Sequence, residues 1–474
     1  MKKHIHFVYD FKFPNGYLQF GYDKSTIRNN FFYQVEYSNT EEVVLSNPYN
    51  PSEFTTQIGM FADEYISSNK NWNKIGVNQI QDILDRKHYN NTQNYFIICL
   101  EATNSSSFFE YYLNPNLDFD NLFSPKLLDF FKKRQEFKLI LVDNREGSYY
   151  HNPALFTKIS KWLDKNNIVD KNKVIISTCN EKINDIPIND KRIRTYNNDY
   201  YLYYSGKFIV ECEERNNIIT ETNNDYVYSL QDKIKFDKRE KYFLNYNRNS
   251  GRFHRPFLIN ELYNKNILDK GIVSLLKTNE FDNIITDIKN NLKDYNPDFG
   301  LDLQNEDYKT IYLNHKNWYP LVIDNDNEEE VAWYHNFLSR KDEYEKTYFT
   351  IVSETNVSKY FRFLTEKTVK PIMNLHPFII FGNPGSIGQL QRMGFQTFSD
   401  FWDESYDEEK DFKKRTEMLI NLVKELTDKS FEEWNEMLTN MEPILRHNKN
   451  VLLKMERYKQ FPFDIIRNIL NHTI

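Results

Sequence analysis

The sequence feature that most limits the possible folds is the alternation of strand and helix patterns between Tyr348 and Asp407. Two short apolar runs, Tyr348–Val352 and Phe378–Phe381, are each followed by a helical pattern. Short apolar runs bounded by turn residues are typical of strands that are buried on both faces. His376-Pro377 ends the first helix, and the turn Gly382–Gly385 precedes the second. Strands that alternate with helices predict a parallel sheet of the α/β class.

The same alternation occurs in the rest of the 474-residue chain. Further strand-like runs precede or follow helical patterns, and they are Lys3–Tyr9, Tyr95–Leu100, Phe137–Val142, Lys173–Ser177 and Lys241–Tyr246. A polar, irregular stretch separates the two series. We therefore predict an α/β protein with two Rossmann-like domains, residues 1–215 and 238–440, joined by a linker at 216–237 and followed by terminal helices at 441–474.

Polar residues stand where such a fold places its ligands. Glu354 follows one buried strand, and Thr365-Glu366-Lys367 opens the next helix. In open α/β sheets ligands bind beyond the carboxyl ends of the strands, and helix N-termini attract anions. A glutamate can accept hydrogen bonds from a ribose diol, and a lysine can meet a phosphate. The alternative is that Glu366 only stabilises the helix N-terminus and Lys367 is solvated.

A basic loop follows the first strand of the second series. Asn247–Pro256 contains Arg248, Arg252 and Arg255 and no carboxylate. A basic, glycine-containing loop between a strand and a helix is a natural cradle for a diphosphate. The alternatives are a contact with RNA and a solvated loop.

These motifs resemble the donor-binding half of GT-B glycosyltransferases, and of these the α-1,3-fucosyltransferase family is the most similar. The resemblance rests on the order of Ser353-Glu354-Thr355-Asn356, Thr365-Glu366-Lys367 and Pro377–Gly382. The family has a Glu-Asn-Ser element where this chain has Glu354-Thr355-Asn356. The resemblance covers about sixty residues and implies a GT-B-like fold with terminal helices that cross back to the first domain.

The resemblance also implies roles for individual residues. Glu366 would meet the nucleotide ribose, and Lys367 would meet the diphosphate together with an arginine of the basic loop. The candidate nucleotide-binding residues are Arg248, Arg252, Arg255, Glu354, Asn356, Thr365, Glu366 and Lys367. The implied donor is a nucleotide-sugar, either a UDP- or a GDP-sugar, and arginine and lysine would stabilise the departing diphosphate without a metal ion.

The predicted activity is transfer of the sugar to a hydroxyl acceptor, such as a glycan. If the reaction inverts the sugar, a carboxylate of the first domain has to deprotonate that hydroxyl. Glu101, Asp143 and Glu146 follow strand-like runs there and are the candidates. Asp324-Asn325-Asp326 has the Asp-x-Asp form of a metal–nucleotide site, but its acidic surroundings favour a solvated loop.

Composition excludes some classes of protein. The net charge of −7 disfavours a protein that coats nucleic acid. No apolar run is long enough for a membrane span or a signal peptide, so we expect a cytoplasmic protein. Frequent Asn, Lys, Ile and Tyr indicate an AT-rich genome, viral or bacterial, and thus a host-cytoplasmic location if viral. Two alternatives stay open: a viral glycosyltransferase acting on hydroxymethylated DNA bases, and a non-catalytic GT-B-like structural or interaction protein.

Overall fold

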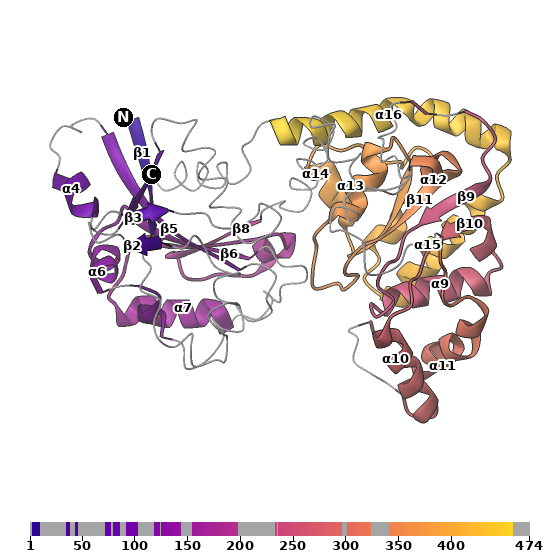
Figure 1. Cartoon of the computed structure of the whole chain (residues 1–474), viewed down its shortest axis with the longest axis horizontal. Helices are drawn as coiled ribbons and strands as arrows, with labels where there is room; N and C mark the ends of the chain where they lie inside the picture. Colours follow the sequence, from indigo (N-terminus) through magenta and orange to yellow (C-terminus); the bar gives the residue numbers. More distant parts are fainter. Residues whose placement is uncertain are drawn as a thin grey trace. The chain divides into compact units, whose positions relative to one another are not determined.

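The chain forms two compact units. One contains Met1–Asn198 and Gln460–Ile474, and the other contains Asp199–Lys459. The computed structural model describes residues 2–9, 35–37, 43–45, 72–76, 79–85, 92–102, 118–123, 125–143, 154–197, 233–234, 236–295, 301–323 and 341–457. Figure 1 labels most of the helices and strands of both units.

The first unit is built on a six-stranded sheet in the order β4-β1-β5-β6-β7-β8, in which every paired neighbour is parallel. Its strands are β1 (Lys2–Tyr9), β4 (Trp72–Gly76), β5 (Thr92–Ala102), β6 (Phe137–Asp143), β7 (Val174–Thr178) and β8 (Ile193–Asn197). A separate antiparallel pair is formed by β2 (Val35–Tyr37) and β3 (Val43–Leu45). The helical segments are α4 (Gln79–Asp85), η2 (Phe119–Leu122), α6 (Pro125–Lys133), α7 (Ala154–Lys165) and η3 (Glu181–Asp185).

The second unit is built on a four-stranded parallel sheet in the order β10-β9-β11-β12. Its strands are β9 (Lys241–Asn245), β10 (Gly271–Val273), β11 (Thr347–Ser353) and β12 (Phe378–Phe381). The helices are α9 (His254–Asn264), α10 (Asn279–Asn290), α11 (Asn305–Asn314), α12 (Lys341–Glu345), α13 (Glu366–Met373), α14 (Ser386–Arg392), α15 (Phe412–Thr427) and α16 (Phe431–Arg457), with short 3-10 segments η4 (Leu268–Lys270), η5 (His315–Asn317) and η7 (Ser405–Glu408).

The strand order fixes which face of this sheet each helix covers. From the centre of the sheet, α9 leads outward to β10, whereas α13 leads in the opposite direction to β12. Because parallel crossovers are right-handed, crossovers in opposite directions place their helices on opposite faces. Contacts agree with this, since α9 packs against α15 and α13 packs against α16.

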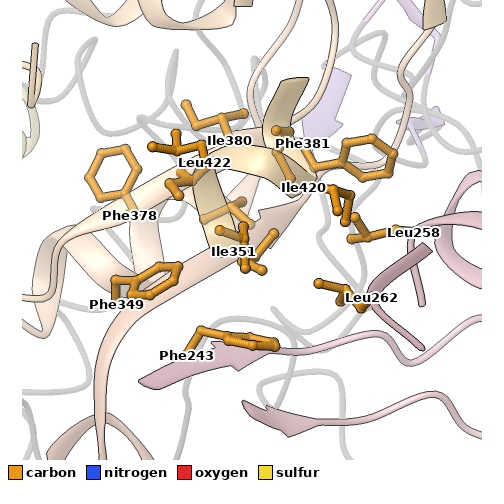
Figure 2. Packing of buried hydrophobic residues seen from close by; sticks show 14 of the residues in the cluster. Phe243, Leu258, Leu262, Phe349, Ile351, Phe378, Ile380, Phe381, Ile420 and Leu422 are labelled. Carbon is orange, nitrogen blue, oxygen red and sulfur yellow. The ribbon is translucent and has the colours of Figure 1, made fainter. Parts of the chain in front are cut away.

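The core of the second unit fills both sides of the sheet. Figure 2 shows side chains from the four-stranded sheet, such as Phe243, Phe349 and Ile351, packed with residues of α9 and α15. Every residue of β11 is buried, as expected for a central strand of a parallel sheet. Trp434 of α16 stacks on Phe349 with ring centroids 5.4 Å apart, which fixes the long helix against the sheet.

The α/β class and the parallel sheets predicted from sequence are confirmed, and the topology fits a Rossmann-like arrangement in each unit. The predicted boundary at residue 440 is wrong, because α16 runs without a break through it to Arg457. Trp434, Met441 and Leu452 all lie in the core of the second unit. Their helical spacing places them on one buried face, so α16 belongs to this unit up to its last described turn. Among the described residues, no helix is long and apolar enough to cross a membrane.

Candidate functional site

The four-stranded sheet has a topological switch point between β9 and β11. The chain leaves these two neighbours in opposite directions, toward β10 and toward β12. At such a point the loops after the two strands diverge and leave room for a ligand. The loops that follow β9 and β11 are the basic loop and the segment 354–364, so the two motifs singled out in the sequence meet here.

Glu354 is the first residue after β11, and its side chain is the main hydrogen-bond acceptor of the loop that follows. Its side chain is fully buried. Its carboxylate accepts hydrogen bonds from Thr365 Oγ1 at 2.6 Å, Thr368 Oγ1 at 2.6 Å, the Thr365 backbone N–H at 3.2 Å and the Thr355 backbone N–H at 3.2 Å. Four donors satisfy most of the acceptor capacity of a carboxylate. Glu354 therefore holds the start of α13 against the end of β11, and its oxygens are not available to a ligand in this structure.

Lys367 and Glu366 form the part of the Thr-Glu-Lys motif that remains accessible. Lys367 Nζ lies 2.6 Å from Glu366 Oε1 and 3.1 Å from Thr355 Oγ1. The Lys367 side chain is 22% exposed and that of Glu366 is 14% exposed. Burial is the largest single influence and raises the pKa of Glu366, but the charge of Lys367, its hydrogen bond and the charge of Lys370 together outweigh burial, so that pKa is lowered. Glu366 is thus an ionised acceptor beside an ammonium group.

Thr365 is the N-cap of α13 and connects these groups. Its hydroxyl donates to Glu354 and accepts from the Lys367 backbone N–H at 3.4 Å, and Lys367 Nζ lies 3.2 Å from the same oxygen. The side chain is completely buried. Thr365 therefore positions Glu366 and Lys367 and presents no free group of its own.

The basic loop is fastened to the end of β11 by two side chains. Arg252 Nη1 donates to the Thr355 carbonyl at 3.1 Å, and His254 Nε2 donates to the Glu354 carbonyl at 3.0 Å. A carbonyl only accepts, so His254 carries its proton on Nε2. Burial, followed by the charges of Arg255 and Arg252, lowers the pKa of His254 well below its usual value. The imidazole is neutral and acts as a fixed hydrogen-bond donor between the two loops.

Arg248 and Lys370 add positive charge on the same side of the sheet. Arg248 is exposed, and no described residue forms a hydrogen bond or an ion pair with it. Burial lowers the pKa of Lys370 to about 8; Glu366 opposes this shift, whereas Lys367 and Arg248 add to it. The ammonium of Lys370 is therefore electrostatically coupled to all three groups. A cluster with this surplus of cations is a favourable place for an anion.

The remaining predicted binding residues have structural contacts. Arg255 is buried in the first turn of α9, where its Nη1 donates to the Asn249 carbonyl at 3.2 Å. Asn356 Oδ1 accepts from the Ser358 backbone N–H at 2.7 Å and from Asn383 Nδ2 at 3.4 Å. The structure thus places Arg248, Arg252, Glu366 and Lys367 together as the accessible part of the site, with Arg255, Glu354, Asn356 and Thr365 behind them.

The three candidate catalytic residues belong to the first unit. Glu101 lies near the end of β5 and Asp143 ends β6, and the neighbouring strands pair Ala102 with Asp143. Their backbones therefore lie at the same edge of the six-stranded sheet. Glu146 lies outside the described residues, as does Asp324-Asn325-Asp326. Among the described residues, no group of three or more His, Cys, Asp or Glu side chains is arranged to hold a metal ion.

Two features of the site were not predicted from the sequence. Lys370 could have been found, because it lies four residues after Glu366 and so shares a helix face with it. The bracing role of His254 could not, because it depends on a contact across one hundred residues. No family model matches the sequence, and no curated protein matches it either.

Proposed function

We propose that this protein is a GT-B-type glycosyltransferase that moves a sugar from a nucleotide-sugar to a hydroxyl acceptor. The observation that carries the proposal is the surplus of positive charge at the switch point between β9 and β11. Arg248 and Arg252 come from the basic loop, Lys367 and Lys370 come from α13, and the accessible carboxylate among them is Glu366.

The chemistry of these groups fits a diphosphate flanked by a ribose. Arginine and lysine bind phosphate oxygens through charge-assisted hydrogen bonds, which are stronger than neutral ones. Glu366 is ionised, so it can accept from the two hydroxyls of a ribose. Its distance of 2.6 Å to Lys367 Nζ supports the proposal, because a nucleoside diphosphate needs an acceptor for its ribose beside a cation for its phosphates. In the proposed complex, adjacent residues of one helix supply both groups.

The same cations support the transfer step. When the sugar leaves, negative charge develops on the diphosphate, and donors that are already in place stabilise that charge without reorganisation. Arg252 is held by the Thr355 carbonyl and Lys367 by two threonine hydroxyls, so both are positioned before the ligand arrives. We propose that the acceptor hydroxyl is deprotonated by a carboxylate of the first unit, Glu101, Asp143 or Glu146.

The proposal is tested by measuring the melting temperature with UDP, GDP, CMP, dTDP and ADP and with the matching nucleotide-sugars. A ligand that binds only the folded protein raises its melting temperature, and at one hundred times the dissociation constant the stabilisation is about 2.7 kcal/mol. We expect one nucleotide to raise the melting temperature more than the others do. We expect the Lys367→Ala variant to lose that shift, because the variant lacks the cation nearest to Glu366.

The control is Lys309→Ala, which removes a partly exposed lysine of α11 that pairs with Glu306 at 3.1 Å. This variant should keep the full shift. The nucleotide identified in this way then selects the nucleotide-sugar for a transfer assay that follows release of nucleoside diphosphate with a panel of acceptors. Absence of a shift with every nucleotide at millimolar concentration would contradict the proposed function.

A further inference from the structure

Two buried asparagine side chains at the carboxyl edge of the four-stranded sheet each have an oxygen without a hydrogen-bond partner. Asn247 follows β9 and Asn383 follows β12, and their side chains are 0% and 1% exposed. Neither Asn247 Oδ1 nor Asn383 Oδ1 accepts a hydrogen bond. A buried polar atom left unpaired destabilises the folded protein, so such an atom needs an explanation.

The orientation of the Asn247 amide is fixed by its neighbours. Its Nδ2 donates to Asn245 Oδ1 at 2.5 Å, and Asn245 Nδ2 in turn donates to the Ile351 carbonyl at 2.6 Å. The Asn247 backbone is also held, because its N–H donates to Ser274 Oγ at 3.0 Å. Turning the Asn247 amide over would place two oxygen acceptors against each other, so the unpaired atom of Asn247 is an acceptor.

Asn383 is held in the same way on the other side of β11. Its Nδ2 donates to the Ser358 carbonyl at 2.8 Å and lies 3.4 Å from Asn356 Oδ1. The backbone carbonyl of Asn383 accepts a hydrogen bond from Ser386 Oγ at 2.7 Å. Both neighbours of Nδ2 are acceptors, so the amide cannot be reversed and Oδ1 is again the unpaired acceptor.

Asn247 and Asn383 follow the two strands that flank β11, and Lys367 contacts the loop after β11. β9 and β12 are separated only by β11, and neighbouring strands are about 4.8 Å apart, so the strand ends that carry Asn247 and Asn383 are about 10 Å apart. Lys367 Nζ contacts Thr355, which belongs to the loop after the middle strand. Across the carboxyl edge, the loop after β9 therefore carries Asn247, the loop after β11 contacts Lys367, and the loop after β12 carries Asn383.

We infer that Asn247 and Asn383 are specificity-determining residues that accept hydrogen bonds from the two ends of an elongated ligand with an anionic centre. A nucleotide-sugar has this form, since hydroxyl and N–H donors flank its diphosphate on both sides. Inorganic pyrophosphate has the anionic centre without the two ends. The inference rests on the proposed function and names the feature by which the site selects the whole donor molecule.

The experiment compares three ligands by calorimetric titration of the full-length protein: pyrophosphate, the nucleoside diphosphate that binds best, and the corresponding nucleotide-sugar. The variants are Asn247→Ala and Asn383→Ala. Each should bind pyrophosphate as the wild type does. One should bind the nucleoside diphosphate about three- to tenfold more weakly, and the other should weaken only the nucleotide-sugar, by a similar factor.

The matched control is Asn374→Ala. Asn374 is also a buried asparagine with an unpaired Oδ1, and its Nδ2 donates to the Lys370 carbonyl at 2.9 Å. It precedes β12 and so lies at the opposite edge of the sheet from Asn383. The control variant should bind all three ligands like the wild type. Where an alanine variant does not fold, the serine variant at the same position is used, and unchanged pyrophosphate binding shows that the site is intact.

The outcomes separate the inference from the function on which it rests. If the wild type binds the nucleotide-sugar and both asparagine variants bind it equally well, the inference is overturned and the proposed function stands. An equal loss of affinity for all three ligands also overturns it, because that pattern is the result of a distorted site. If the wild type binds no nucleotide-sugar, both are overturned.

Discussion

The two edges of the four-stranded sheet both carry basic residues, but these residues differ in burial and in hydrogen-bond partners. At the amino edge, Arg239 and His376 are buried, and both donate to the carbonyl of Thr347. At the carboxyl edge, His254 is buried in the same way, but Arg248 is exposed and Lys367 is partly exposed. A cation that has backbone carbonyls as partners stabilises the fold, whereas a cation that remains accessible can bind an anion. The environment of a basic residue thus indicates its role better than its position in a motif does.

The sharpest test of this comparison is the substitution Glu354→Ala, which removes a buried carboxylate at the carboxyl edge of the sheet. Replacing it with alanine leaves four donors without their acceptor, so we expect a loss of about 3–5 kcal/mol in the free energy of unfolding of the second unit. Urea titration followed by tryptophan fluorescence measures this loss. Glu366→Ala is the control and should cost far less stability, because that side chain is partly exposed. A small loss of stability in Glu354→Ala would contradict the structural role that we assign to this carboxylate at the carboxyl edge.

The amino edge should make stability depend on pH. Burial lowers the pKa of His376 from its usual value near 6.5 to about 3. Between pH 6.5 and 3 the unfolded chain binds a proton that the folded protein does not, so stability falls as the pH drops, by up to about 1.4 kcal/mol per pH unit from this residue. His376→Gln keeps a neutral donor and acceptor and should flatten this slope in urea titrations between pH 7 and 4.

The matched variant at the other edge is His254→Gln. It should also flatten the acid slope, because burial keeps that imidazole neutral as well. Only His254→Gln should change the affinity for a nucleotide, since His254 fastens the basic loop to β11. Equal effects of both variants on nucleotide affinity would remove the distinction between the two edges.

Gly385 tests how tightly the turn after β12 is packed. Its φ of +80° is in the left-handed region, and a Cβ there would lie 2.7 Å from Arg362 Nη2. Gly385→Ala should therefore lower the free energy of unfolding by about 1–2 kcal/mol from backbone strain, and further from the clash. Gly394 has a φ of +92°, and a Cβ there would have no atom within 4 Å, so Gly394→Ala reports the backbone strain alone. Equal losses for the two variants would show that the contact with Arg362 contributes nothing.

The smallest expected effect belongs to Arg248. Removing this exposed side chain should leave the melting temperature of the free protein unchanged, because no described residue pairs with it. The affinity for a nucleotide should fall about two- to fivefold at low salt, and the difference should shrink at high salt because exposed charges are screened. Titration at two salt concentrations measures both. A salt-independent loss would assign Arg248 a structural role instead.

The sequence predicted elements whose signals are local. The apolar runs of β11 and β12 are short and bounded by turns, and both strands form where expected. Thr365-Glu366-Lys367 opens α13 as expected, with Thr365 as the N-cap. These features depend on residues within one turn of each other, so a single sequence contains the necessary information.

The arrangement of the site depends on contacts that no local pattern reports. That Glu354 is an internal hydrogen-bond acceptor follows from the packing of Thr365 and Thr368, eleven and fourteen residues away. The contact between His254 and the Glu354 carbonyl depends on how β9 and β11 pair. The extent of α16 was missed because the terminal helices were placed by the resemblance to GT-B proteins, whereas the buried face of α16 continues the core of the second unit.

The two hydrogen bonds from the basic loop to the end of β11 have a consequence for how fast a ligand binds. Arg252 and His254 hold the loop in place before any ligand is present. A site that is already assembled requires no loop closure, so association should follow a single exponential with a rate proportional to ligand concentration. Rapid-mixing experiments should then show no slow phase that is independent of ligand concentration, and differences in affinity among nucleotides should arise from how long each one stays bound.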